Sequence, residues 1–335
     1  MRSKLRRYVS FALLAVAVAA GVLYIYARRE RFAAIAGVPV VGIVALVAVG
    51  FCFRATEAVM LRDVLRELGS HLGVSESQLI SWSIAYWNLL PLKPGTGGLG
   101  IYLKRRHGIS FSDFGAYLLA VNLLRMAIRG TLGLGLSVPL CALHGLSPLV
   151  PSLFAGLLGA CVAVMLLPLR WEYAGRHRLL RIASRASRSW HEMRGRHGLL
   201  ARVAGWKLLE SVLGATALFL CFRLTGTDIG FTEAFTVQLV ASLSRLAAVV
   251  PAQLGVREAL TGAAGMAFGF TFADGVVAAA LRRAVSLTLV AVVGPLSSWA
   301  LHRLWTAAPE PVERAGAGAG EGGGQSNSTT PGHGV

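Results

Sequence analysis

The chain has 335 residues, of which 55% are hydrophobic and 15% are charged, and it carries a formal net charge of +17. A water-soluble domain cannot bury so much apolar surface, so the composition excludes a soluble protein and predicts an all-α polytopic membrane protein. The basic excess is typical of cytoplasmic loops and of contact with anionic lipid headgroups. Nucleic acid is not the expected partner, because no basic stripe is interleaved with aromatic residues.

Cysteine and histidine give no sign of a metal site. The four cysteines lie in apolar stretches and none is part of a CxxC pair. Such cysteines are structural thiols rather than metal ligands, and the histidines form no HExxH pattern. We therefore expect no metal and no cofactor.

The N-terminal part predicts two membrane spans and a surface helix. Residues 2–7 are basic and precede an apolar run over 8–27, and no small-residue cleavage site follows this run. A retained first span with its N-terminus inside is expected rather than a signal peptide. A second span covers 37–53. Charged and apolar residues alternate over 54–72, which indicates an amphipathic surface helix on the cytoplasmic side.

A stretch rich in proline and glycine, residues 88–108, interrupts the next hydrophobic run. Proline cannot continue a helix, and glycine can turn sharply. The preceding helix, 79–90, is too short to cross, because a span needs about 20 residues. We predict a re-entrant pair that returns through 99–106, where Lys104-Arg105-Arg106-His107 places its end on the cytoplasmic face. Ser75-x-x-Gln78 resembles a capping box that opens the first helix.

The apolar stretch 111–143 could cross the membrane once, with a kink, or twice. The arginine-rich segment 170–202 decides between these, because the positive-inside rule places it in the cytoplasm only if 111–143 crosses once. Two more spans flank this segment, at 149–168 and 203–224. Three arginines disagree with the positive-inside rule in this topology, because it places them outside the cell: Arg28, Arg29 and Arg31.

The second half of the chain repeats the pattern of the first. Pro91-x3-Gly95 recurs as Pro251-x3-Gly255, and flanking motifs recur at the same offset of about 160 residues, too long for a solenoid repeat. A second broken pair is expected over 232–250 and 256–268, followed by a last span over 276–303. An odd number of intervening spans inverts the second repeat relative to the first. Paired, interrupted segments of this kind indicate a transporter-type binding site.

These elements give about six full transmembrane helices and two broken re-entrant pairs related as an inverted repeat. The domain boundaries that follow are an integral membrane domain over 1–306, with repeats at 37–143 and 203–305 and a cytoplasmic basic segment at 170–202, and a disordered cytoplasmic tail over 307–335.

Several charges lie within or beside apolar segments: Lys93, Arg125, Arg129, Arg245, Arg257, Glu258, Arg282 and Arg283. A charge at membrane depth costs about 2.5–3.5 kcal/mol, so such groups usually face a cavity or a partner. Arginine presents a planar fork that suits phosphate or carboxylate.

Each of these charges also has a structural alternative. Lys93 and Lys104 could be snorkelling anchors. Arg125 could pair with Asp113, and Arg257 with Glu258. Adjacent Arg282 and Arg283 are not expected to face the core together. Two further points stay open. Trp82, Tyr86 and Trp87 could serve in packing or as ligands. Glu210 could be a proton or cation site or take part in a buried hydrogen bond.

Two signatures resemble those of the lysylphosphatidylglycerol synthase transmembrane-region family. The first is Asn88-x2-Pro91 with the glycine-rich turn, Tyr102-Leu103-Lys104 and His107-Gly108-Ile109-Ser110. The second is Val250–Glu258 followed by Arg283, with Ala252-Gln253 where the family usually has Gly-Gly. The resemblance covers about residues 8–305. It implies lipid translocation or lipid-linked handling rather than lipid synthesis, since only a glycine-rich tail follows the last span.

The interrupted segments and the resemblance together give the candidate substrate-binding residues: Asn88, Pro91, Lys93, Gly95, Gly97, Gly98, Tyr102, Lys104, Arg125, Arg245, Pro251, Gln253, Gly255, Arg257, Glu258 and Arg283. No catalytic residue is assigned. The expected partners are membrane lipids with anionic headgroups, and the oligomeric state stays open, a homodimer included. We expect a multi-pass protein of the bacterial or archaeal cytoplasmic membrane with both termini in the cytoplasm.

The leading hypothesis is a flippase-like protein that moves or binds an anionic phospholipid or a polyprenyl-linked lipid. An integral-membrane lipid-modifying enzyme, such as a glycosyltransferase, is the alternative. The aspartates argue against a metal-dependent version of it, because none lies within two residues of another acidic group. A non-transporting membrane scaffold is the third reading.

Overall fold

The computed structural model describes residues 37–67, 69–90, 94–109, 111–144, 147–166, 190–191, 193–246 and 255–306, together with Tyr26, Glu30 and Ile35. All regular structure in these ranges is helical. In chain order the helices are α3 (Val40–Glu67), α4 (Val74–Trp87), α5 (Pro94–His107), α6 (Phe111–His144), α7 (Leu149–Leu166), α9 (His197–Leu224), α10 (Phe231–Ser242), the short 3-10 helix η1 (Leu243–Leu246), α11 (Val256–Met266) and α12 (Phe272–Thr306).

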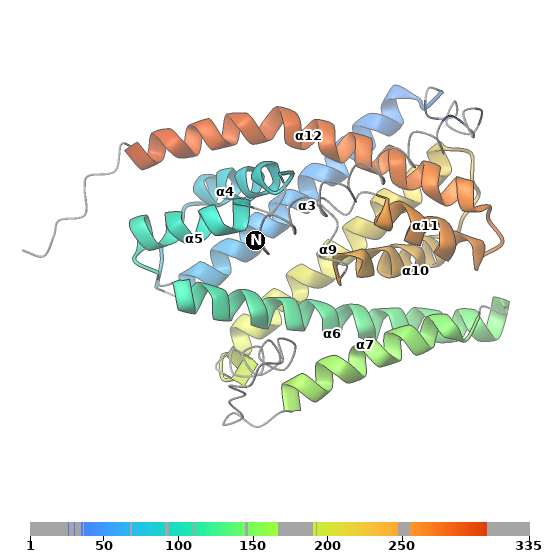
Figure 1. Cartoon of the computed structure of the whole chain (residues 1–335), viewed down its shortest axis with the longest axis horizontal. Coiled ribbons are helices and arrows are strands. Elements are labelled where there is room, and N and C mark those ends of the chain that lie inside the picture. Colours follow the sequence, from blue (N-terminus) through green and yellow to red (C-terminus); the bar gives the residue numbers. More distant parts are fainter. Residues whose placement is uncertain are drawn as a thin grey trace, which may run out of the picture.

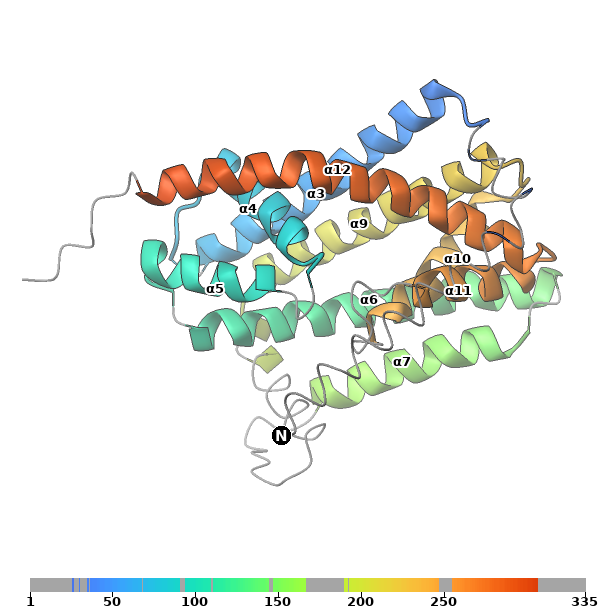
Figure 2. The same cartoon turned by 45° about the horizontal axis from the view of Figure 1, so that its top comes forward.

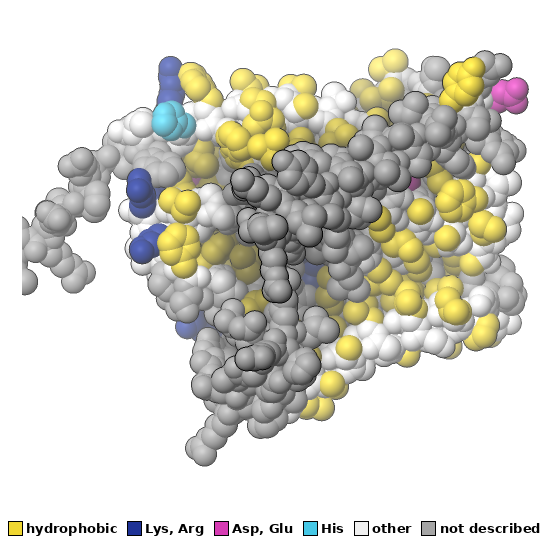
Figure 3. Space-filling view, in the orientation of Figure 1, with side chains coloured by type: hydrophobic (Ala, Val, Ile, Leu, Met, Phe, Trp, Pro, Cys, Tyr) yellow, Lys and Arg dark blue, Asp and Glu magenta, His cyan; other side chains and the backbone are white. Residues whose placement is uncertain are grey.

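Five of the described helices are long and apolar enough to cross a membrane: α3, α6, α7, α9 and α12. Much of their apolar surface faces outward. Val41 and Leu166 are 80% and 76% exposed, and Trp299 is 56% exposed. Figure 3 shows hydrophobic side chains over most of the described surface, with Lys and Arg gathered at the end where α5 and α12 finish. This is an all-α polytopic membrane protein. The expected first span, 8–27, and the tail, 307–335, lie outside the described residues.

The predicted surface helix over 54–72 is wrong. The structure has one continuous helix, α3, across both the predicted span and this segment. Its second half is interior, because Thr56, Ala58 and Leu65 are buried where α3 packs against α4 and α9. The prediction failed because Arg54 and Glu57 line an interior cavity, whereas Arg66 and Glu67 at the end of the helix are exposed.

The stretch 111–143 forms a single helix, α6, of 34 residues, as a single crossing requires. Its glycines serve helix packing rather than a turn. A β-carbon on Gly133 would lie 2.3 Å from the ring of Phe154 in α7, and one on Gly130 would lie 3.0 Å from Leu158. Figures 1 and 2 show α7 beside the second half of α6, with the two helices diverging toward the end of α7.

Two broken helix pairs, α4–α5 and α10–α11, lie beside opposite halves of α12 (Figures 1 and 2). The chain leaves α5 into the start of α6, at the end of the molecule where α12 finishes. It leaves α11 into the start of α12, at the opposite end. The outer ends of the two pairs therefore lie at opposite ends of the long helices, and the end of α4 and η1 lie toward the middle of the molecule.

The first break is shorter than predicted. Gly95, Gly97 and Gly98 belong to α5 rather than to a loop. Gly95 is needed because α4 and α5 approach closely, so that a β-carbon there would lie 2.5 Å from the carbonyl oxygen of Ile84. The predicted capping box at Ser75 is also wrong, because α4 begins at Val74 with Gly73 as its N-cap and no side-chain cap.

Helix α12 contacts both broken pairs, and a glycine lies at each contact. A β-carbon on Gly275 would lie 2.7 Å from the α-carbon of Gly262 in α11. One on Gly294 would lie 2.5 Å from the β-carbon of Tyr86 in α4. Pro295 follows directly, inside the helix. The two halves of the molecule are thus packed onto one helix of 35 residues.

Candidate headgroup site

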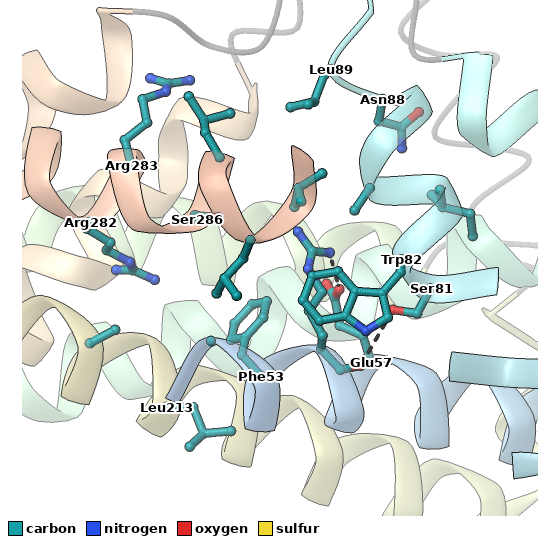
Figure 4. A pocket seen from close by; sticks show the side chains of 18 of the residues that line it. Phe53, Glu57, Ser81, Trp82, Asn88, Leu89, Leu213, Arg282, Arg283 and Ser286 are labelled. Carbon is teal, nitrogen blue, oxygen red and sulfur yellow. Dashed lines mark hydrogen bonds and ion pairs between the residues drawn. The ribbon is translucent and has the colours of Figure 1, made fainter. Parts of the chain in front are cut away.

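A cavity of about 780 Å³ lies between the two broken pairs and is walled by α3, α4, α5, α6, α9, α11 and α12. Figure 4 shows side chains from α3, α4 and α12 pointing into it. The polar and charged residues on its wall are Arg54, Glu57, Ser81, Trp82, Asn88, Thr96, Asn122, Arg125, Arg257, Glu258, Arg282, Arg283 and Ser286.

The cavity is positively charged. Among the described residues of its wall are five arginines and two glutamates, a formal excess of three positive charges. Arginine does not lose its proton at any physiological pH, so this excess is permanent. In the low dielectric of a membrane interior such a field strongly favours an anion over a neutral or cationic guest.

Gln238 of α10 holds two of these arginines. Its Oε1 accepts hydrogen bonds from Arg257 Nη2 at 3.3 Å and from Arg282 Nη1 at 2.5 Å. Gln238 is buried, and α9 makes room for it at Gly214, where a β-carbon would lie 3.0 Å from Gln238 Nε2. One amide therefore orients two guanidinium groups from different helices toward the same space.

Glu258 connects the start of α11 to α12. Its Oε2 accepts a hydrogen bond from the backbone N–H of Gly255 at 2.9 Å, which caps α11, and its other carboxylate oxygen pairs with Arg283. Gly255 has φ +80°, a left-handed conformation that glycine adopts without strain. The expectation that Arg282 and Arg283 could not both face the interior is wrong. Both side chains line the cavity, although they leave α12 in opposite directions (Figure 4), and each reaches a partner on a different helix.

The opposite wall comes from the first half of the chain. Arg54 Nη1 pairs with Glu57 Oε2 at 2.6 Å, and the guanidinium carbon of Arg54 lies 5.9 Å from the centre of the Trp82 ring. Asn88 bridges the break between α4 and α5, because its Nδ2 donates to Thr96 Oγ1 and its Oδ1 accepts from the Thr96 N–H, both at 3.3 Å. Asn88 thus fixes how α5 starts beside the cavity.

Of the candidate residues predicted from the sequence, the structure brings five together on the cavity wall: Asn88, Arg125, Arg257, Glu258 and Arg283. Gly95 and Gly255 lie beside the wall as packing and capping residues, and Gly97 and Gly98 are exposed on α5. Four candidates lie outside the described residues: Pro91, Lys93, Pro251 and Gln253. The side chain of a fifth, Arg245, is not described.

Tyr102 and Lys104 lie away from the cavity, near the outer end of α5. Tyr102 donates a hydrogen bond to Glu76 of α4, and Arg106 Nε lies 3.0 Å from the same carboxylate. Lys104 is exposed, with its ammonium 5.3 Å from the centre of the Phe111 ring. These residues therefore hold the outer ends of the helices and do not face the interior space.

Sequence reasoning missed Arg54, Glu57 and Trp82, and it did not include Arg282 or Gln238 among the candidates. The i, i+3 spacing of Arg54 and Glu57 directly after an apolar run was a usable signal, because a pair at that depth needs an interior polar environment. Gln238 carries no charge, and nothing in its local sequence distinguishes it. Within the described ranges, no group of three or more His, Cys, Asp or Glu residues could hold a metal ion.

The model of the family described as "Lysylphosphatidylglycerol synthase TM region" matches residues 9–294. The chain belongs to this family. The matched range includes both broken pairs and every described residue of the cavity wall, so the family assignment rests on the part of the molecule that holds the site. It gives this multi-pass membrane protein a role connected with membrane lipids. No curated protein matches the chain, and no solved structure does.

Proposed function

We propose that this protein binds the headgroup of an anionic phospholipid or a polyprenyl-linked lipid in the central cavity and moves it between the leaflets. One observation carries the proposal. Five arginines from both halves of the chain line one space between the two broken pairs. A charge at membrane depth costs about 2.5–3.5 kcal/mol, and a bound phosphate that receives the forked hydrogen bonds of these arginines would offset part of that cost.

The dimensions of the cavity suit a headgroup rather than a whole lipid. Sites of roughly 300–1,000 Å³ hold drug-sized ligands, and the cavity measures about 780 Å³. The acyl chains would remain in the bilayer beside the exposed apolar surfaces of Leu89 and Leu287, two wall residues that are 36% and 39% exposed. The protein would therefore screen only the polar end of the lipid during transfer.

The opposed broken pairs supply a route for alternating access. By the positive-inside rule, the end that carries Lys104, Arg105, Arg106 and Arg303 faces the cytoplasm, with both chain termini on that side. The α4–α5 pair would then be re-entrant from the cytoplasm and the α10–α11 pair from the outside. Rocking of one pair against the other would open the cavity to each side in turn. No catalytic step is part of this proposal.

A leaflet-accessibility assay on reconstituted protein tests it. Vesicles containing fluorescent anionic, zwitterionic and polyprenyl-linked lipids are compared for the wild type, Arg257→Ala and Arg202→Ala. Arg202 is a matched control, because it is a half-exposed arginine that pairs with Glu67 away from the cavity. We expect anionic lipid to move with the wild type and the control, and Arg257→Ala to slow it at least about tenfold, the loss of one charged hydrogen bond.

The outcomes separate the readings. If no lipid moves or binds with the wild type, the proposal fails. If Arg202→Ala slows transfer as much as Arg257→Ala, the cavity is not the site. Mass spectrometry of the recovered lipid completes the test, because a chemically altered lipid would identify a lipid-modifying enzyme instead.

A further inference from the structure

A second cluster of charges lies behind the cavity wall, between α6 and α9. Lys207 and Glu210 of α9 are 2% and 3% exposed and pair with each other. Two arginines of α6 approach the same carboxylate. Arg129 Nη2 lies 3.5 Å from Glu210 Oε1, and Arg125 Nη2 lies 3.9 Å from Glu210 Oε2. One buried carboxylate thus faces three basic groups.

The charged groups that act on Lys207 come from three helices. They are Glu210 on α9, Arg125 and Arg129 on α6, and Glu57 on α3. From α10 and α12, Gln238 and Arg282 approach α9 at Gly214, one turn beyond Glu210. With Lys207 itself, three basic groups face two carboxylates, an excess of one positive charge, and burial without water makes such an excess costly.

Lysine is the one basic member of this cluster that can become neutral. The guanidinium groups of Arg125 and Arg129 keep their protons at every accessible pH, whereas a buried amine gives up its proton readily. Loss of the Lys207 proton removes one positive charge while the amine stays in place as a hydrogen-bonding group. This is the least costly way to reduce the excess when the cavity is empty.

Arg125 connects the cluster to the cavity, because it lines the cavity wall and also faces Glu210. Its distance to Glu210 is long for an ion pair, so a phosphate in the cavity competes well for it. A bound anion would neutralise the charge of Arg125 or draw it away from α9. Either change removes positive charge from the surroundings of Lys207.

We propose that Lys207 is a proton-binding site linked through Arg125 to the headgroup site, so that binding of an anionic headgroup is accompanied by uptake of one proton from water onto the Lys207 amine. This inference rests on the proposed headgroup site. Linkage is reciprocal, so protonation of Lys207 must strengthen headgroup binding by the same factor. Affinity for the anionic lipid is therefore high at low pH and falls as the pH rises and Lys207 loses its proton.

Calorimetric titration of the full-length protein in detergent with short-chain phosphatidylglycerol tests this linkage. Paired buffers of different ionisation enthalpy give the number of protons taken up per headgroup bound. Three proteins are compared with the wild type: Lys207→Arg, which keeps the charge permanently, Lys207→Met, which removes it permanently, and Lys104→Arg, a matched control at an exposed lysine outside the cavity.

For the wild type and Lys104→Arg we expect uptake of a substantial fraction of a proton and a fall in affinity of about tenfold from neutral to alkaline pH, the effect of a coupling near 1.4 kcal/mol. Lys207→Arg should bind without proton uptake or pH dependence. If it does not fold, Lys207→Met gives the same test, with weaker, pH-independent binding expected.

Two results would overturn the proposal in distinguishable ways. Phosphatidylglycerol binding by the wild type without proton uptake, or equal uptake by a folded Lys207 variant, refutes the linkage and leaves the headgroup site standing. Absence of any binding by the wild type refutes the headgroup site, and the linkage fails with it.

Discussion

Replacing Gln238 by glutamate places a negative charge between two cavity arginines with almost no change of shape. The amide oxygen already accepts hydrogen bonds from Arg257 and Arg282, so a carboxylate would keep both contacts and strengthen them. We expect Gln238→Glu to fold at least as well as the wild type and to bind anionic headgroups more weakly, because it cancels part of the positive charge that a phosphate would use.

The size of the effect follows from the geometry. Gln238 Oε1 lies 3.3 Å from Arg257 Nη2. A phosphate on the far side of that guanidinium would be roughly 7 Å from the new carboxylate, and at an effective dielectric constant of about 20 the repulsion is about 2.4 kcal/mol. Affinity should therefore fall about 50-fold. Gln238 is 7% exposed, so screening by solvent is small.

Calorimetric binding of short-chain phosphatidylglycerol measures this loss, with the melting temperature in detergent as the check on folding. Gln238→Met is the control, because it removes the acceptor without adding charge. It should lower stability by about 1.5–3 kcal/mol, the value of hydrogen bonds to charged groups, and weaken binding less than Gln238→Glu does. A folded Gln238→Glu protein with wild-type affinity would refute the idea that these arginines hold the headgroup.

Two further predictions concern packing. Gly275→Ala should lower stability by about 1–3 kcal/mol, because the added β-carbon meets backbone atoms of α11 at 2.7 Å. Gly156→Ala is the control and should not lower stability, because no atom of a neighbouring helix lies within 4 Å of the added β-carbon. Melting temperatures compare the two proteins, and equal values would contradict the close contact at Gly275. Glu76→Gln removes the carboxylate that holds Tyr102 and Arg106 of α5. Helix α5 should therefore separate from α4 more often, and limited trypsin digestion should cut its basic end about tenfold faster. An unchanged rate would show that this carboxylate does not hold α5.

The order of the helices and the position of both breaks could be predicted from the sequence, because these features depend on local properties. Hydrophobic runs fix the long helices, and the Pro91–Pro94 and Pro251–Gly255 motifs fix where helices must stop. The single crossing of α6 also followed from the sequence, through the arginines of the segment 170–202, because charge distribution constrains topology independently of packing.

The composition of the cavity wall could be predicted only in part, because it depends on how helices rotate against one another. Arg257 and Arg283 stood out as charges in apolar segments and were found on the wall. Arg54 was assigned to a surface helix, since its neighbours are also charged and only packing against α4 and α9 shows that they are interior. Gln238 carries no charge at all, so its role in orienting arginines is visible only in three dimensions.

Helix α12 is about 50 Å long at 1.5 Å per residue, and it touches α11 near its beginning and α4 near its end. Gly275 packs on the backbone of α11 and Gly294 on the side chain of Tyr86 in α4, so neither broken pair can slide along α12 without a change in packing at that contact. Pro295 lacks a backbone N–H and so removes one helical hydrogen bond beside the α4 contact, where a helix bends most easily. If the two broken pairs act as gates in the proposed transport cycle, their movements would be joined through one backbone, which would favour opening one pair as the other closes.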